Sequence, residues 1–295
     1  MDNLAAQQVH IHLKQTEIKG RYPRLWSRVI SQWRAQDAED RAWLIYSANY
    51  LFRTGNVRWA IDPIRLKQRL DHAPEMEFVK DLDKLSFVLL THEHADHLDF
   101  NLLYALRELP ILWIVPEPIL PEVLAKSALP DQNIIIPKAM VPIQIKGIRI
   151  LPFDGLHREH LHTSGTFAPQ ETVRGVSSMG YLVEFSGKRW LFPGDTRTYD
   201  ARQLPSFGAL DGIFAHLWLG RACALIDEPP LAAAFCRFCV ALEPRKIVVT
   251  HLEEYGRQAE DYWSERHFKI VQRWFREHAP EVHVEAAHIG ESISL

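Results

Sequence analysis

The chain has 295 residues, of which 47% are hydrophobic and 24% charged, with a formal net charge of −3. This is the composition of an ordinary soluble globular protein, and its mild acidity gives no general reason to expect nucleic acid or an anionic membrane as a partner. We find no apolar run long enough for a membrane span, and no basic start followed by an apolar stretch as in a signal peptide. We therefore expect a cytoplasmic protein with one large α/β domain or two small ones.

The three cysteines argue against a disulfide framework, because their number is small and odd. Cys236 and Cys239 form a C-x-x-C pair, which would suit zinc or redox chemistry. They lie in the apolar helical stretch 231–242, however, and no second pair accompanies them. We expect these cysteines to act as small buried hydrophobic residues.

Residues 1–41 are predicted to form a helical extension packed on the core. Within it, residues 21–34 carry four arginines, two tryptophans and no acid. This pattern predicts an amphipathic helix that packs Trp26, Ile30 and Trp33 on the core. The alternatives are a basic flap over an active site or a subunit contact, and the latter would make the protein a homo-oligomer.

Strand patterns begin near residue 43. Residues 43–52 and 57–61 are predicted strands that flank the turn signal Thr54-Gly55-Asn56. The second of these strands ends at Asp62. That aspartate is either a simple turn residue or a carboxylate that orients a nearby metal ligand.

A dense group of ionisable residues follows the next apolar strand, 86–91. The six residues after it are His92-Glu93-His94-Ala95-Asp96-His97. His92 and His94 lie two positions apart, so in an extended segment both side chains point to the same side. Imidazole and carboxylate suit zinc and other divalent first-row metals, and so many ionisable groups rarely gather without such a partner. The stretch therefore predicts a metal site.

The rest of the chain alternates between strands and helices. Asp99 is the predicted N-cap of a helix over 100–109. Further helices are predicted at 118–129, 231–242 and 263–278, and further strands at 111–115, 133–136, 140–145, 148–153, 176–185, 188–192, 210–219 and 246–250, with a closing pair of strands in 282–295. Residues 158–175 lack periodicity and are predicted to form a lid loop over the site. This order fits two sheets face to face with helices outside.

More donor residues follow the ends of later strands. His157 lies just past a predicted strand, and His160 and His162, which follow at once, are its rivals as a donor. Asp195 lies in a Gly-Asp-Thr turn, where one carboxylate could hold two metals, one with each oxygen. An apolar strand ends directly before His251.

These motifs, in this order, resemble the metallo-β-lactamase superfamily, whose members are usually two-metal hydrolases. The resemblance covers residues 42–295 and implies an α/β (α+β) fold, the four-layer αββα sandwich. It implies that His92, His94 and His157 hold the first metal, that Asp96, His97 and His251 hold the second, and that Asp195 bridges them. We expect two divalent ions, with zinc favoured and manganese or iron as alternatives. The hairpin ending in Asp62 and the Gly-Asp-Thr turn are most similar to the branch that contains ascorbate-6-phosphate lactonase and N-acylphosphatidylethanolamine phospholipase D.

Two cations about 3.5–4 Å apart lower the pKa of a shared water to roughly 7, which gives a metal-bridging hydroxide at neutral pH. We predict that it hydrolyses an ester, lactone or phosphodiester bond of a small cytoplasmic metabolite, and an anionic metabolite is among the candidates. The predicted catalytic residues are Asp96, Asp195 and His216, and the proton donor to the leaving group is left open among Asp195, His160 and His216. The alternatives are an RNA-processing nuclease and a non-catalytic metal-binding module of the same fold.

Overall fold

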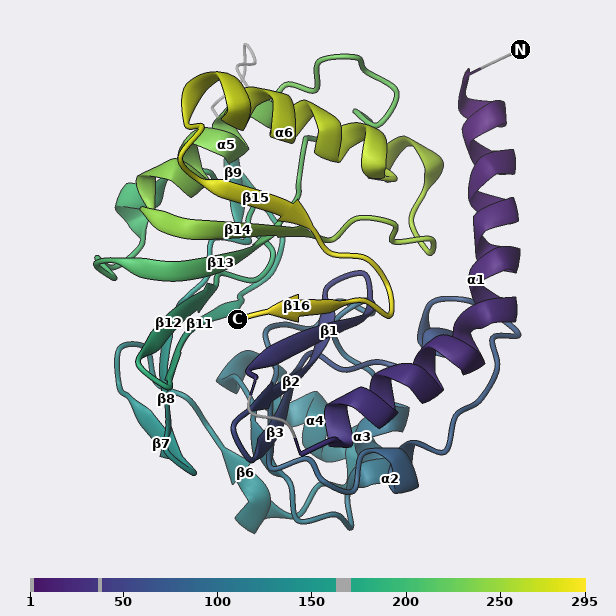
Figure 1. Cartoon of the computed structure of the whole chain (residues 1–295), viewed down its shortest axis with the longest axis vertical. Helices are drawn as coiled ribbons and strands as arrows, with labels where there is room; N and C mark the ends of the chain where they lie inside the picture. The colour runs from purple at the N-terminus through teal and green to yellow at the C-terminus, as the bar shows by residue number, and fades with distance from the viewer. Residues whose placement is uncertain (1–2, 37–38, 163–170) are drawn as a thin grey trace.

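Two mixed β-sheets that pack against each other form the centre of the molecule (Figure 1). The computed structural model describes residues 3–36, 39–162 and 171–295, and within these ranges each large sheet has seven strands. Across the first sheet the order is β16 (Ser292–Ser294), β1 (Arg41–Tyr46), β2 (Asn49–Thr54), β3 (Val57–Ile61), β4 (Phe87–Leu89), β5 (Leu112–Ile114) and β6 (Ile134–Ile135). Across the second it is β15 (His283–Ala286), β14 (Pro244–Thr250), β13 (Leu210–His216), β12 (Lys188–Phe192), β11 (Met179–Phe185), β8 (Ile148–Asp154) and β7 (Ile143–Ile145).

Helices cover the outer faces of both sheets (Figure 1). Beside the first sheet lie α2 (Phe78–Asp81), α3 (Phe100–Leu106) and α4 (Leu120–Ser127), and beside the second lie α5 (Ala232–Ala241) and α6 (Glu265–His278). The predicted sandwich of two sheets between helices is thereby confirmed. Cys236 and Cys239 are buried in α5, as expected for small apolar residues.

Aromatic side chains join the two sheets. Tyr50 of β2 meets Phe214 of β13 edge-on, with ring centroids 4.9 Å apart, and Phe52 meets Phe192 of β12 at 5.4 Å. Phe52 also stacks on Trp59 at 3.9 Å within the first sheet. Edge-to-face pairs of this kind add to the stabilisation that burial already gives. They hold the sheets in a fixed relation, so that loops at the ends of strands in both sheets can form one site.

The direction of the strands decides where that site lies. Strands β3 to β6 run parallel to one another, and so do β12 to β15. Parallel neighbours end at the same edge of a sheet, and ligands in α/β sheets bind beyond the carboxyl ends of the strands. We therefore expect the predicted donor residues to lie in the loops after β3, β4, β12, β13 and β14.

The N-terminal helix α1 (Asn3–Arg34) packs its C-terminal half on the first sheet (Figure 1). Trp26, Ile30 and Trp33 are buried, which confirms the predicted packing stripe. The indole N–H of Trp33 donates to the Phe52 carbonyl oxygen at 2.8 Å, and the Tyr22 hydroxyl donates to the Ile45 carbonyl oxygen at 3.0 Å. The division into an extension, 1–41, and a hydrolase domain, 42–295, stays a prediction. Within the described ranges, no helix is both long and apolar enough to cross a bilayer.

One predicted strand is in fact two. The sequence pattern predicted a single strand over 43–52, but the chain turns at Ser47 and Ala48 between β1 and β2. No glycine or proline marks this turn. It is held instead by the carbonyl oxygen of Ser47, which accepts from the backbone N–H of His251 at 2.9 Å and from the Thr250 hydroxyl at 3.0 Å. A long-range contact, rather than local turn chemistry, reverses the chain here.

Two other predictions are corrected. The stretch 158–175, predicted as an irregular lid, contains an antiparallel pair, β9 (Glu159–His162) and β10 (Glu171–Arg174), and residues 163–170 lie outside the described part. The two C-terminal strands do not pair with each other. β15 extends the second sheet beside β14, whereas β16 crosses to the first sheet and pairs with β1. Strand pairing depends on neighbours distant in sequence, which a local pattern does not contain.

Candidate metal centre

The loop after β4 places its donors through a short turn. The backbone N–H groups of His97 and Leu98 both donate to the carbonyl oxygen of His94, at 2.8 and 2.9 Å. Asp99 then caps α3, because its carboxylate accepts from the backbone of Asn101 and Leu102. This confirms the predicted N-cap and fixes the direction in which the preceding donor side chains point.

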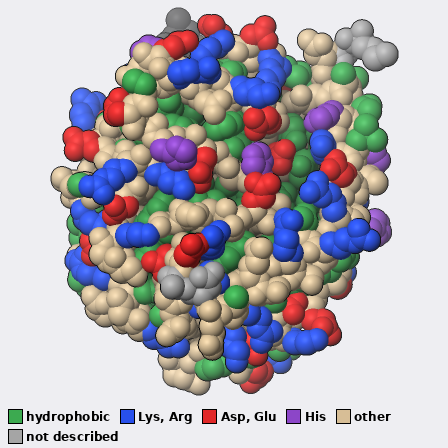
Figure 2. All heavy atoms as spheres, in the orientation of Figure 1, with side chains coloured by type: hydrophobic (Ala, Val, Ile, Leu, Met, Phe, Trp, Pro, Cys, Tyr) green, Lys and Arg blue, Asp and Glu red, His purple; other side chains and the backbone are tan. Residues whose placement is uncertain are grey.

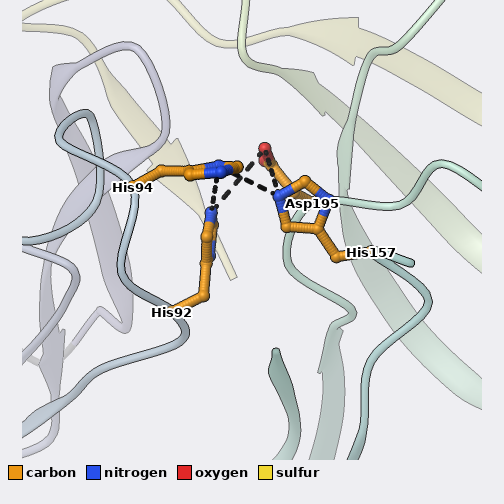
Figure 3. A group of neighbouring side chains, drawn as sticks. All are labelled: His92, His94, His157 and Asp195. Carbon is orange, nitrogen blue, oxygen red and sulfur yellow. Dashed lines mark hydrogen bonds and ion pairs between the residues drawn. The ribbon is translucent and has the colours of Figure 1, made fainter. Parts of the chain in front are cut away.

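A first group of donors consists of His92, His94, His157 and Asp195 (Figure 3). His94 Nδ1 lies 3.2 Å from His92 Nε2 and 3.1 Å from His157 Nε2. The Asp195 Oδ2 atom lies 3.9 Å from His92 Nε2 and 3.7 Å from His157 Nε2. Two ligand atoms of a tetrahedral zinc site lie about 3.3–3.4 Å apart when each bond to zinc is about 2.0–2.1 Å long. The spacing and chemistry of this group therefore fit a divalent ion.

A second group consists of Asp96, His97 and His251. His251 Nε2 lies 3.1 Å from Asp96 Oδ2, and His251 Nδ1 lies 3.5 Å from Asp195 Oδ1. His97 Nε2 lies 3.3 Å from the same Asp195 oxygen and, among described residues, has no hydrogen-bond partner although it is buried. Asp195 thus faces the first group with Oδ2 and the second with Oδ1. The two groups together suggest a binuclear metal site.

Asp62 orients one of these donors. Its Oδ2 lies 2.8 Å from His97 Nδ1, which leaves Nε2 of that ring turned toward Asp195. The backbone N–H of Thr91 donates to Asp62 Oδ1 at 2.8 Å, so the loop that carries the histidines is tied to the same carboxylate. Outer partners of this kind fix the tautomer and orientation of a metal-binding histidine. Of the two roles left open for Asp62, the geometry favours this one.

Burial prepares most of the histidines to act as neutral ligands. Removal from water is the main reason why the pKa of His157 falls to about 4 and that of His251 to about 3. The pKa of His92 is lowered for the same reason. Burial opposes ionisation of Asp96 and Asp195, but the surrounding histidines hold the pKa of both well below the usual value. At neutral pH these groups present imidazole lone pairs and carboxylates, the forms that bind metal.

His97 behaves differently from the other buried histidines. Burial lowers its pKa, but the negative charge of Asp195 and the hydrogen bond of Asp62 outweigh burial and raise the pKa well above its usual value. In the metal-free protein this ring is therefore the cation that balances the carboxylates around it.

His216 lies beside Asp195 and is almost fully buried. Its Nδ1 is 2.8 Å from Asp195 Oδ1, and it comes from the last residue of β13. His97, Asp195 and His216 also form a third cluster of close donor atoms. The structure thus brings His216 to the predicted site, while its role stays a prediction.

All seven predicted ligands come together, and only His94 is more than slightly exposed. Solvent therefore reaches the site from the His94 side. His157 is the histidine that joins the first group, whereas the side chains of its rivals His160 and His162 lie outside the described residues.

Arg257 is a site residue that the sequence did not single out. Its Nη2 lies 2.8 Å from His251 Nε2 and 3.5 Å from Asp96 Oδ2, so a permanent cation sits beside the second group. It is six residues beyond His251, in an irregular loop in which His251 and Glu253 have φ angles of 66° and 56°. Strained backbone of this kind is found at functional sites. No local pattern in the sequence points to this arginine.

Comparison with solved structures supports the fold. A metallo-hydrolase from the hyperthermophilic archaeon Ignicoccus hospitalis, Igni18, is 15% identical, with a TM-score of 0.60 over 87% of this chain and 98% of that one. CmlA, a diiron β-hydroxylase from Streptomyces venezuelae, is 18% identical with a TM-score of 0.60, and the match covers 88% of this chain but 55% of CmlA. Zinc-bound PqqB from Methylobacterium extorquens is 16% identical with a TM-score of 0.51, over 84% of this chain and 87% of that one.

Sequence comparison gives the family. No curated protein matches the chain. Residues 58–252, well over half of the chain, match the family model described as the beta-lactamase superfamily domain. The matched range begins in β3 and ends just after His251, so it contains all seven donor residues of the two groups. The chain belongs to the beta-lactamase superfamily.

Proposed function

We propose that the protein is a metal-dependent hydrolase that cleaves an ester, lactone or phosphodiester bond of a small metabolite. The observation that carries the proposal is the convergence of seven donors into two groups that share Asp195. When bound, two divalent ions supply an activated water as nucleophile and neutralise the charge that develops on the attacked group.

The roles of the chain's own residues follow from their contacts. His92, His94 and His157 would hold one ion, and Asp96, His97 and His251 the other, with Asp195 between them. Asp62 keeps His97 in the required orientation. We assign His216 to proton donation to the leaving group, because it lies against Asp195 and therefore next to the reacting centre.

Zinc is the metal that we favour. Five of the seven donors are imidazoles and two are carboxylates, a nitrogen-rich set that suits zinc, while manganese and iron stay as alternatives. The fold itself does not decide the metal, because CmlA is a diiron protein and PqqB binds zinc.

The substrate that we propose is a small molecule with an anionic group, in the cytoplasm. Figure 2 shows basic and acidic side chains interspersed over the face it presents, without the single-sign basic stripe typical of nucleic-acid binding. This supports a metabolite over RNA. The closer likeness to the ascorbate-6-phosphate lactonase and N-acylphosphatidylethanolamine phospholipase D branch stays a proposal, as does assembly into a homo-oligomer.

Metal analysis combined with turnover tests the proposal. The protein would be loaded with zinc, manganese or iron, its metal content measured, and its activity assayed on bis-p-nitrophenyl phosphate and a panel of lactones. We expect two ions per chain and turnover on at least one substrate class. Two ions with no turnover on any substrate would instead favour a non-catalytic binding module.

A further inference from the structure

Arg197 brings a cation to the open side of the metal centre. It follows Asp195 by two residues, and its backbone N–H donates at 2.8 Å to the carbonyl oxygen of Leu156, the residue before His157. These two links tie Arg197 to the turn that carries Asp195 and to the loop that carries His157. Both residues belong to the first group, in which His94 is the donor that solvent reaches.

Trp218 supports this arginine. The guanidinium carbon of Arg197 lies 4.9 Å from the centre of the Trp218 ring, and that of Arg221 lies 5.7 Å from the same ring. Trp218 follows His216 by two residues, and the Tyr199 hydroxyl both donates to its carbonyl oxygen at 2.8 Å and accepts from its N–H at 3.0 Å. Tyr199 thus fixes the backbone of Trp218, and burial fixes its ring. Cation–π contact with such a ring holds a guanidinium in place without using its N–H groups.

The N–H groups of Arg197 have no acceptor in the described part of the chain. The acids whose charges act on this arginine are Asp195 and Glu159. Asp195 faces the two donor groups, and Glu159 lies 3.5 Å from Arg221. Arg197 itself is partly buried and, unlike Arg221 and Arg257, has no carboxylate within ion-pair distance among the described residues. A guanidinium held in place without such a partner favours a bound anion.

We propose that Arg197, held on Trp218, binds an anionic oxygen group of the substrate next to the first metal position. This inference rests on the proposed hydrolase function and narrows its substrates to molecules with a phosphate or carboxylate near the scissile bond. A planar guanidinium forms two parallel hydrogen bonds to either group. Arg221, which contacts the same ring, is more exposed than Arg197 and pairs with Glu159.

Anion binding to the metal-loaded protein tests this inference by calorimetry. Orthophosphate and succinate would be titrated into the wild type and into the Arg197→Gln, Arg197→Lys and Arg202→Gln variants, each with its metal content measured. We expect Arg197→Gln to weaken binding of the preferred anion at least about tenfold, because the anion loses hydrogen bonds to a charged group. Arg197→Lys should have a smaller effect. Arg202 is the control, because it is exposed and pairs with Asp200.

The outcomes separate this inference from the proposed function. If Arg197→Gln binds orthophosphate more weakly than the wild type does, the substrate group at Arg197 is a phosphoryl group. If the variant binds succinate more weakly, that group is a carboxylate. Equal affinities in the wild type and in both Arg197 variants would overturn the inference, even if the wild type hydrolyses esters. Loss of anion affinity in Arg197→Gln, together with no turnover by the wild type on any substrate, would uphold the anion site and contradict the hydrolase.

Discussion

The two donor groups share Asp195 but differ in the charges around them. In the first group, three imidazole nitrogens approach one another to 3.1 and 3.2 Å, and burial keeps those rings neutral. In the second, His97 is held as a cation between Asp62 and Asp195, and Arg257 lies 2.8 Å from His251. The first group is ready for a metal, whereas the second already holds positive charge.

This difference predicts unequal affinities. An ion that enters the first group meets lone pairs and a carboxylate, and it displaces no proton from a ring that is already neutral. An ion that enters the second must displace the proton of His97 and tolerate the charge of Arg257. Because metals and protons compete for the same ligand atoms, we expect the first group to bind its ion more tightly.

Removal of Asp96 should give the largest effect, because the second group would lose its carboxylate. We expect Asp96→Ala to lower turnover by more than about 100-fold. Loss of a residue that only orients a metal ligand already costs up to about 100-fold, and Asp96 would bind the metal directly. The fold should change little, since the side chain lies at the site and not in the core. Turnover and circular dichroism would be compared with the wild type. Unchanged turnover would remove the second group from the mechanism.

Removal of His157 should cost one ion. We expect His157→Ala to keep the ion of the second group and to lose that of the first. Only two imidazoles and a shared carboxylate would remain to hold the ion of the first group. His160→Ala is the matched control and should keep both ions. Elemental analysis of the two proteins decides the matter. Loss of metal from the His160 variant alone would reverse the assignment of the third histidine.

Removal of the charge of Arg257 should strengthen the second group. We expect Arg257→Gln to raise affinity for the second ion at least about fivefold, because even in water two unit charges about 4 Å apart repel by about 1 kcal/mol. Titration against a competing chelator measures this affinity. Arg266→Gln, which removes an exposed arginine paired with Asp227, is the control. Unchanged or weaker affinity in Arg257→Gln would contradict the proposed difference between the groups.

The claim that burial lowers the pKa of a histidine can be checked on a histidine outside both groups. His267 is buried in α6, and removal from water lowers its pKa to about 4. Below pH 6.5 the unfolded chain gains a proton that the folded chain does not take up until about pH 4, so stability falls as the pH falls through this window. The expected loss at pH 5.5 is about 1 kcal/mol.

Urea unfolding of the metal-free protein at pH 7 and pH 5.5 measures this loss. His267→Gln should show a smaller drop in the free energy of unfolding than the wild type. His283→Gln, which changes an exposed histidine on β15, should show the same drop as the wild type. An equal drop in all three proteins would show that burial of a neutral histidine does not produce the effect.

Much of the fold and of the site could be predicted from local patterns in the sequence. The strand before His92, the turn around Asp195 and the strand before His251 are such patterns, and the structure places each as predicted. The turn at Ser47 and the separate sheets of β15 and β16 were missed. Bonds and pairings to distant residues hold these features, and no local residue type marks them.

The sequence by itself determined which residues can bind a metal, because imidazole and carboxylate at the ends of apolar strands carry that chemistry wherever the strands lie. Only the tertiary structure decided how the donors divide into two groups and which cations stand beside them. Arg197 and Arg257 show the reason. Each is an ordinary loop arginine in the sequence, and the packing of the two sheets brings its charge to the metal centre.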